Sequence, residues 1–431
     1  MHASLKRTMK QLNERDIEAL RSIYMYRCLN KEQLYHLHYA LSLVTQEPIT
    51  DQTAKKRLKK MTQLGLIEPV TPMSKVINSE PEPVYFLTNN GIQVIRYYFD
   101  LPTNVYDNKN HVVKRGYYRA SELKIYPKNI NHQVYLNQFV LDFIQEHPQT
   151  PYKYYDEKHV SQFTDIRPDG MLTIGDTDFF LEMDMATESR KQLQDKWDNY
   201  RRFIHSNEFA FKERQIVVLF ICGNTEREQE RIDLVYRTLF DQVIDVFNKD
   251  IDIHVGTHHQ LLQLLTTKYI PRIFNQKGQH AQLYPLFRKQ GFLISKGEVL
   301  KPIASAYYPH YYVQQRQNDV LMKEFVVDDF TDKPVSTFHH LAYFHQFKMY
   351  FSRYFNRSIR YIIVGQTEDE IYHYLTIVRL LQGKDIYFTT PERLQRLPFH
   401  QALFQFNSLG YRYHFEDDTL QKQIFEDEKS R

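Results

Sequence analysis

The feature that most constrains the fold is an uninterrupted apolar run, QIVVLFIC, at residues 215–222. A strand covered on both faces has this composition, and such strands are typical of sheets flanked by helices. Periodicity predicts helices on either side of the run, over about 187–204 and from about residue 226, and IDIHV predicts a further strand at 251–255. We therefore expect an α/β fold.

The length of the chain and its residue usage bound the class of protein. At 431 residues the chain is too long for one ordinary core, and two to four domains are expected. Its 42% hydrophobic and 25% charged residues are typical of a globular protein. Tyr (32) and Phe (29) are abundant while Gly is scarce (13), which favours large aromatic cores and argues against glycine-rich nucleotide-binding loops.

Charge, cysteine usage and apolar runs limit the possible partners and the cellular compartment. The net charge of +4 is mild, so any basic surface must be local. Cys28 and Cys222 provide neither a disulfide framework nor a zinc-ligand spacing. The polar N-terminus lacks a signal-peptide apolar region, and no apolar run approaches the roughly 20 residues that span a bilayer. The sequence therefore predicts a soluble, cytoplasmic protein with no membrane partner.

Residues 1–100 have the pattern of a small helical domain with two strands. Apolar spacing predicts helices in NERDIEALRSIYMYRCL, KEQLYHLHY and DQTAKKRLKKMTQLG, the last with Ala54, Leu58 and Met61 as its buried stripe. LIEPV and VYFL predict two strands, and TNNGIQVIRYYF predicts a fourth helix. Three helices followed by a β-ribbon is the order of a winged helix-turn-helix, and these phrases are similar to many members of that superfamily.

The third of these helices carries a dense group of basic side chains. In a winged helix-turn-helix this helix enters the major groove, where Lys and Arg neutralise phosphates and make the affinity salt-dependent. The predicted DNA-binding residues are Thr53, Lys55, Lys56, Arg57, Lys59 and Lys60. Of these, Thr53, Lys56 and Arg57 are expected to face the groove. The alternatives are a solvated basic face and a winged helix that contacts only proteins.

Residues 101–128 are polar and basic with few periodic apolar positions, and we interpret them as a linker. Lys114 and Arg115 are predicted to make a second contact with the DNA backbone. The other basic residues of the segment that fit this role are Arg119, Lys124 and Lys128. An ordinary solvated linker explains the composition equally well.

A predicted hairpin, RPDGMLTIGDTDFFLEMD, at residues 167–184 contains five carboxylates, of which three are candidates for a cation site. Asp169 precedes one strand, and Glu182 and Asp184 lie on the next, with the turn at Gly175 and Asp176. Glu182 and Asp184 are two residues apart and so point to the same face. Carboxylates are poor strand formers, so these acids either hold a cation at a reaction centre or are remnants of such a site.

The order of elements over residues 129–270 resembles the PD-(D/E)XK nuclease-like fold. The resemblance implies that Asp169 and Glu182 bind Mg²⁺, which prefers hard oxygen ligands and can activate water for phosphodiester cleavage. The family's Lys is replaced by Asp184, which is expected to add a ligand or orient water. The resemblance leaves Lys191 or Lys196 on the following helix for that lysine's role, and Glu157 as a further acidic ligand.

A closer resemblance covers about residues 10–260. The winged helix, NHQVYLN with His132 and Asn137, EKHV with Glu157, RPDGML, FFLEMDMATES and KWDNYRRF together are similar to the replication-relaxation family. That family occurs on plasmids and integrated mobile elements of Gram-positive bacteria and is associated with plasmid replication and DNA relaxation. The resemblance implies that His132 helps to organise the site, although a structural histidine is the simpler reading.

The second half of the chain resembles the first. FFLEMD and EFVVDD, GNTE at 223–226 and GQTE at 365–368, and IDIHVGT and DIYFTT occur in the same order. This pattern predicts a degenerate second copy of the α/β unit over residues 271–415, followed by a charged tail at 416–431. Aligning the strands places Val327 opposite Glu182 and Asp329 opposite Asp184. No Pro-Asp pair precedes that strand near GFLISKGEVLKPI, so the second copy is expected to lack two metal ligands and to serve dimerisation or partner binding.

These observations predict a multi-domain α/β protein that binds a specific double-stranded DNA site, as a homodimer, in replication initiation, relaxation or mobilisation. It is expected to work with a replication or conjugation protein, and, if it cuts, to be a Mg²⁺-dependent nickase. The alternative is a non-catalytic initiator or transcriptional regulator, and a third class is a toxin or defence nuclease. Tyr200 is a remote candidate for a covalent nucleophile, and the sequence shows no histidine triad of the relaxase kind.

Overall fold

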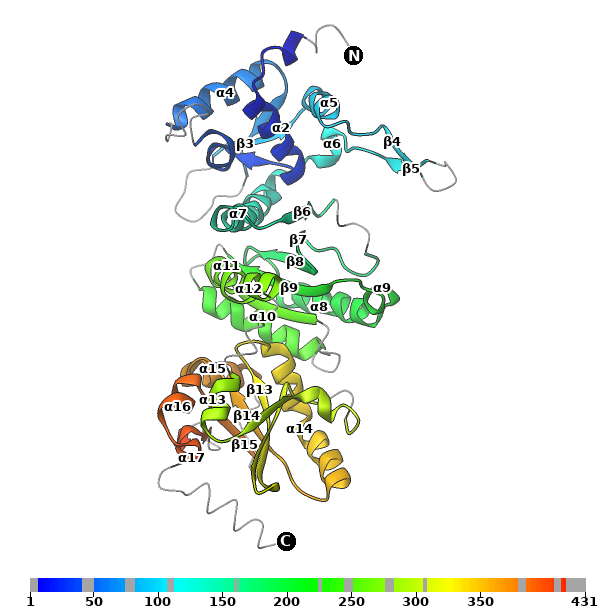
Figure 1. Cartoon of the computed structure of the whole chain (residues 1–431). Helices are drawn as coiled ribbons and strands as arrows, with labels where there is room; N and C mark the ends of the chain where they lie inside the picture. Colours follow the sequence, from blue (N-terminus) through cyan, green and yellow to red (C-terminus); the bar gives the residue numbers. More distant parts are fainter. Residues whose placement is uncertain are drawn as a thin grey trace. The chain divides into compact units, whose positions relative to one another are not determined.

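The computed structural model describes residues 7–40, 50–73, 82–106, 112–158, 160, 163–223, 227–243, 251–275, 283–304, 308–378, 385–406 and 412–415. They form a mixed α/β protein with several sheets, as expected, and Figure 1 labels its elements. The chain divides into two compact units. Unit 1 is Met1–Thr187, Phe220–Glu228 and Thr257–Leu262, and unit 2 is the remainder. No helix among the described residues combines the length and hydropathy that a membrane crossing requires.

Unit 1 begins with helices packed on a three-stranded sheet of order β1-β3-β2. An Asn13–Asp16 capping box starts the first helix, and the expected stripe of Ala54, Leu58 and Met61 is buried in α4. The elements are α2 (Glu14–Tyr26), β1 (Leu29–Asn30), α3 (Lys31–Leu34), η1 (Tyr35–Tyr39), α4 (Asp51–Gln63), β2 (Ile67–Val70), β3 (Val84–Leu87) and α5 (Asn89–Tyr98). This is the element order that a winged helix-turn-helix requires, and that assignment stays a prediction.

The segment interpreted as a linker contains secondary structure of its own. Strands β4 (Asn104–Tyr106) and β5 (Val112–Arg115) pair in an antiparallel two-stranded sheet, and α6 (Ala120–Leu123) and the short helix η2 (Pro127–Asn129) follow. Apolar patterning does not indicate this hairpin, because its strands are only three and four residues long.

A five-stranded sheet of order β10-β9-β8-β7-β6 follows. Its elements, with their helices, are α7 (Ile130–Glu146), β6 (Tyr152–Asp156), β7 (Gly170–Ile174), β8 (Thr177–Asp184), α8 (Arg190–His205), α9 (Asn207–Ala210), β9 (Gln215–Cys222), α10 (Glu228–Val243), β10 (Ile251–Thr257) and α11 (His258–Leu264). The apolar run QIVVLFIC forms β9, and it is buried except for its first residue. The Tyr-rich stretch YKYYD forms β6 and pairs with β7.

Unit 2 contains a seven-stranded sheet of order β11-β12-β13-β14-β15-β16-β17. Its strands are β11 (Leu293–Lys296), β12 (Tyr311–Gln317), β13 (Val320–Asp329), β14 (Arg360–Val364), β15 (Ile386–Thr389), β16 (Phe404–Phe406) and β17 (Arg412–His414). Its helices are η3 (Leu265–Tyr269), α12 (Ile270–Asn275), α13 (Leu283–Lys289), η5 (Gly297–Leu300), α14 (Pro334–Phe355), α15 (Glu368–Val378), α16 (Pro391–Arg396) and α17 (Phe399–Ala402). Helices α13 and α16 pack on the face that carries Val327 and Ile362, and α14 lies on the opposite side of the sheet (Figure 1).

The order of elements in the two large sheets is the same. The series β6-β7-β8-α8-β9-α10-β10-α11 recurs as β11-β12-β13-α14-β14-α15-β15-α16, apart from the short α9 in the first series and the short η5 in the second. In each sheet the five strands are neighbours in chain order. This agreement supports the predicted duplication, which stays a prediction. Residues 224–226 of the first GNTE motif lie outside the described residues, as does the predicted tail at 416–431.

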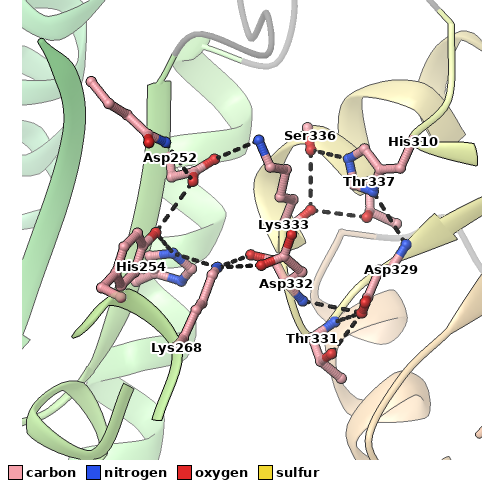
Figure 2. A network of polar contacts seen from close by, with 12 residues as sticks. Asp252, His254, Lys268, His310, Asp329, Thr331, Asp332, Lys333, Ser336 and Thr337 are labelled. Carbon is pink, nitrogen blue, oxygen red and sulfur yellow. Dashed lines mark hydrogen bonds and ion pairs between the residues drawn. The ribbon is translucent and has the colours of Figure 1, made fainter. Parts of the chain in front are cut away.

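A buried polar network holds β10 and η3 to the segment after β13 within unit 2 (Figure 2). The Lys268 ammonium lies 3.1 Å from the Asp332 carboxylate, and the Lys333 ammonium lies 3.6 Å from that of Asp252. His254 Nε2 lies 2.8 Å from the Tyr269 hydroxyl. Buried charges are tolerated only when they are paired in this way, so the network specifies how these elements pack.

Candidate functional site

Strand pairing brings three of the predicted acids to one end of the β6-β7-β8 ladder. Gly170 pairs with Leu181 on β8 and with Asp156 on β6. Continued by one residue, the same antiparallel register brings Asp169 beside Glu182 on one side and beside Glu157 on the other. The glycine at 170 also gives the ring of Tyr154 room, because a Cβ there would lie 3.1 Å from it.

Asp169 is held in place by two neighbours. Its Oδ2 accepts a hydrogen bond of 2.8 Å from the backbone N–H of Met183, and it lies 3.3 Å from Nε2 of His132 on α7. The same ring nitrogen lies 2.8 Å from the carbonyl oxygen of Met183, to which it therefore donates. His132 thus ties α7 to the end of β8 beside Asp169, which is the organising position implied for it by the family resemblance.

Asp184 is fully buried and engaged in a turn. Its Oδ1 accepts a hydrogen bond of 3.1 Å from the backbone N–H of Ala186, which has a φ of 57°. Its carbonyl oxygen accepts a hydrogen bond of 2.8 Å from the N–H of Gly223. An Asp that bonds the backbone two residues on stabilises a turn, so these contacts give Asp184 a structural role at the end of β8.

The four carboxylates do not form a ready-made ligand cage. Among the residues that the structure describes, Glu157, Asp169, Glu182 and Asp184 include no set of three whose ligand atoms lie within 4.8 Å of one another. Mg²⁺ is usually held by one or two carboxylates and keeps several waters. The adjacent pair Asp169 and Glu182 suits that donor set, so the magnesium site stays a prediction.

A cavity of about 530 Å³ opens beside Asp169 in unit 1. Its acidic lining is Glu157 and Asp169, whereas Glu182 and Asp184 are buried behind the surface. Its cationic lining is Arg27, Lys124, Lys128, Lys158 and Arg167. A carboxylate pair surrounded by cations fits a phosphodiester, whose oxygens bind Lys and Arg while the carboxylates are available to a cation.

The sequence did not single out Arg27, which is the most buried cation of this wall. Its Nη1 lies 2.8 Å from the carboxylate of Glu157, and its Nε lies 3.5 Å from that of Asp156. Arg167 lies 3.0 Å from the other oxygen of Glu157. Glu157 is therefore occupied by two guanidinium groups, which favours a positioning role over metal ligation. Nothing in the local sequence around Arg27 could have indicated partners 130 residues away.

The two candidate lysines of α8 lie in unit 2. Lys191 is exposed, and Lys196 forms an ion pair of 3.0 Å with Glu188. Trp197 and Tyr200 on the same helix are buried, so both are core residues as expected and Tyr200 is not presented as a nucleophile.

The basic residues of α4 divide into paired and unpaired groups. Lys55 lies 3.0 Å from Asp51, and the Lys60 ammonium donates to the carbonyl oxygen of Gln11. Lys56 and Lys59 are exposed, and neither side chain has an ion pair or hydrogen bond with the described part of the chain. The unpaired lysines, with half-exposed Thr53, form the surface of α4 best suited to phosphate contacts.

Arg57 does not belong to that surface, although the sequence placed it toward the DNA groove. Its guanidinium pairs with both oxygens of Asp16 on α2, with Nε 2.8 Å from Oδ1. Burial lowers the pKa of the Arg57 guanidinium. Lys114 lies on β5, and Arg115 forms an ion pair of 2.7 Å with Glu122.

Comparison with known proteins covers the first half of the chain. Residues 20–219 match the family described as Replication-relaxation. The matched span runs from within α2 to within β9 and includes α4, the cavity and the β7–β8 hairpin. No curated protein and no solved structure matched the chain.

Proposed function

Because residues 20–219 make this chain a member of the replication-relaxation family, we propose that it binds double-stranded DNA in the replication of a plasmid or mobile element. Family membership suggests the replication role, and the distribution of charge supports DNA as the ligand. The net charge is only +4, yet cations gather on α4 and in the cavity beside Asp169. Duplex DNA presents closely spaced phosphates that such local groups neutralise.

The cavity is the observation that carries the proposal. Two acids and five cationic residues line the same space of about 530 Å³. Arg27 and Arg167 pair with Glu157, and Lys124 pairs with Glu68. The further positive charge of Lys128 and Lys158 suits the anionic phosphates of a DNA backbone. We propose that Lys128, Lys158 and Arg167 bind the backbone there, and that α4 contacts the duplex through Lys56 and Lys59 with Thr53 nearby.

The further step in this proposal is nicking. The residues fit Mg²⁺, because Asp169 and Glu182 are neighbouring hard-oxygen donors at the end of the hairpin. A bound Mg²⁺ supplies Lewis-acid activation of water and of the phosphodiester. His132 orients the Asp169 carboxylate, and the cavity cations position the phosphate.

Incubation of supercoiled plasmid with the full chain and Mg²⁺ or Mn²⁺ tests this step. The proposal predicts nicked circles that disappear with Asp169→Ala and with Glu182→Ala. Asp178→Ala is the matched control, since Asp178 lies on the same strand but at the turn end, where it accepts a hydrogen bond from Thr173. Nicking that persists in both site variants contradicts the assignment of the acids.

A non-catalytic DNA-binding initiator or regulator is the second candidate. The contact that favours it is the Asp184 turn, because the carboxylate that stands in place of the expected Lys is committed to the backbone of Ala186. In this case the chain binds duplex DNA, and the plasmid stays supercoiled whether Mg²⁺ or Mn²⁺ is added. Either candidate function is compatible with a homodimer on an inverted repeat and with a replication or conjugation protein as partner. The mass of the protein in solution, with and without DNA, measures whether it dimerises.

A further inference from the structure

The β12–β13 hairpin of unit 2 repeats the geometry of the β7–β8 hairpin. In the first hairpin Gly170 pairs with Leu181, so Asp169 continues the register beside Glu182. In the second, Tyr311 pairs with Val327, so the same continuation places His310 beside Asp328. A proline stands just before Asp169 and just before His310. By register, His310 and Asp328 are therefore the counterparts of Asp169 and Glu182.

A shared hydrogen bond supports this correspondence. Asp169 accepts from the backbone N–H of Met183, at 2.8 Å. His310 Nδ1 accepts from the N–H of Asp329, at 3.2 Å. In each hairpin, therefore, the residue just before the first strand accepts a hydrogen bond. The donor is the backbone N–H of the residue that follows the acid on the second strand.

The expectation that the second copy lacks an acid here was therefore wrong by one residue. The sequence alignment placed Val327 opposite Glu182, but strand pairing places Asp328 there. A slip of one residue moves a strand's side chains to the other face of the sheet. Val327 belongs to the core under α13 and α16, so Asp328 points to the opposite face, where α14 lies (Figure 1).

His340 on α14 completes a group of three around this carboxylate. Its Nδ1 lies 2.5 Å from Asp328 Oδ2, and Nδ1 of His310 lies 3.5 Å from Asp328 Oδ1. One ligand atom from each of the three residues lies within 4.8 Å of the other two. All three side chains are at least nine-tenths buried, which sets the group apart from an ordinary surface cluster of polar residues.

The surroundings fix the orientation of these side chains. Because the Asp329 N–H can only donate, His310 Nδ1 carries a lone pair, and its Nε2 donates to Ser336 Oγ at 2.6 Å. Ser336 Oγ in turn donates to the carbonyl oxygen of Lys333, and Figure 2 shows His310 beside this chain of contacts. The Tyr361 hydroxyl donates to Asp328 Oδ2 at 2.6 Å. Imidazole ligands oriented through their second nitrogen, and carboxylate ligands that accept further hydrogen bonds, are usual around protein metal ions.

We propose that His310, Asp328 and His340 form a binding site for a transition-metal dication of the Zn²⁺ class in unit 2. Two imidazoles and one carboxylate suit Zn²⁺, Fe²⁺, Ni²⁺ or Cu²⁺, whereas Mg²⁺ and Ca²⁺ select oxygen ligands. The site differs in chemistry from Asp169 and Glu182 at the corresponding place in the first sheet. Metal binding at this site requires neither DNA binding nor nicking, so a test of the site does not depend on the proposed function.

Small adjustments are enough for ligation. Zn²⁺ binds histidine nitrogen at about 2.0–2.1 Å, so ligand atoms on one ion lie within roughly 4.2 Å of each other. The three ligand atoms here lie within 4.8 Å of one another, and rotation of an imidazole is enough to adjust them. The Asp329 N–H contact to His310 Nδ1 is long at 3.2 Å and gives way to the ion. The Nδ1 proton of His340 moves to Nε2 or is released to solvent, since metal ligation requires the unprotonated nitrogen.

Isothermal titration of the EDTA-treated, dialysed full chain with ZnCl₂ tests the site, followed by elemental analysis after gel filtration. The Asp169→Ala/Glu182→Ala background removes the two acids that are proposed to bind Mg²⁺. We expect the chain to bind one equivalent of Zn²⁺, and excess Mg²⁺ not to compete for the site. The thermal unfolding midpoint should rise when Zn²⁺ is added. His310→Gln and His340→Gln are each expected to weaken binding roughly tenfold or more.

His339→Gln is the matched control, because His339 is a buried histidine next to His340 that does not belong to the group. It is expected to retain the wild-type affinity. Absence of stoichiometric Zn²⁺ binding by the background chain overturns the proposal, whatever the variants do. Binding that His310→Gln and His340→Gln leave unchanged, while circular dichroism shows them folded, overturns it equally.

Discussion

Arg57 on α4 pairs with both carboxylate oxygens of Asp16, a fully buried residue on α2. Tyr39 donates to the same carboxylate at 3.2 Å. A basic residue in a predicted DNA-reading helix is thus used to neutralise a buried charge and to fix α4 against α2. The surface of α4 left for DNA consists of its other basic residues, of which Lys56 and Lys59 have no partner among the described residues.

Arg57→Ala is expected to lower the free energy of unfolding by about 3 kcal/mol, because it leaves the Asp16 carboxylate buried and unpaired. Lys56→Ala is the matched control and should change that free energy by no more than about 0.5 kcal/mol. Urea unfolding followed by circular dichroism measures both. Adding Asp16→Asn to Arg57→Ala should recover part of the loss, and equal stability of Arg57→Ala and wild type would contradict the structural role.

Lys56→Ala and Lys59→Ala are expected to weaken duplex binding similarly for all sequences and to leave stability unchanged. Each lost phosphate contact should reduce the slope of log affinity against log salt by about 0.9. Fluorescence anisotropy over a series of KCl concentrations measures the slope. Lys153→Ala, at an exposed position on β6, controls for the loss of one positive charge. Identical slopes for all three variants would exclude α4 as the contact surface.

His254 is expected to make the free energy of unfolding depend on pH. Burial, aided by the charge of Lys268, lowers the pKa of His254 from 6.5 to about 3. The unfolded chain takes up this proton below about pH 6.5, while the folded chain excludes it until about pH 3. Stability from this residue is therefore complete above pH 6.5 and is lost as the pH falls, by about 2 kcal/mol between pH 7 and pH 5.

Thermal or urea unfolding of wild type and His254→Gln at pH 7 and pH 5 measures this effect. The wild type should lose about 2 kcal/mol more than the variant over that interval, because Gln has no proton to exclude. His259→Gln, at an exposed position on α11, should keep the wild-type dependence. Equal losses in wild type and His254→Gln would show that His254 is not the group responsible.

Local patterns in the sequence predicted much of the fold. Continuous apolar residues identified β9, and helical spacing identified α8 and the buried stripe of α4, because these signals depend only on neighbours in the chain. The mixed α/β class followed from them, whereas the family was indicated by a resemblance of motifs along the chain.

The details of the sites depend on partners distant in sequence, and the sequence could not supply these. Arg57 meets Asp16 across 41 residues, and Arg27 meets Glu157 across 130. The place of Asp328 depends on the register between β12 and β13, for which a one-residue error exchanges the two faces. By contrast, the juxtaposition of Asp169 and Glu182 was predictable, because a tight turn at Gly175 fixes the hairpin.

The central claim is that α4 presents Lys56 to double-stranded DNA, and site-specific crosslinking tests it most directly. Cys28 and Cys222 are both buried, so a cysteine introduced by Lys56→Cys can be labelled selectively with a photoreactive group. After illumination with a fluorescently labelled duplex, we predict a protein–DNA crosslink that competing unlabelled duplex and increasing salt suppress. Lys153→Cys carrying the same photoreactive group should crosslink far less. Equal crosslinking from the two positions, or none from either, would contradict the account.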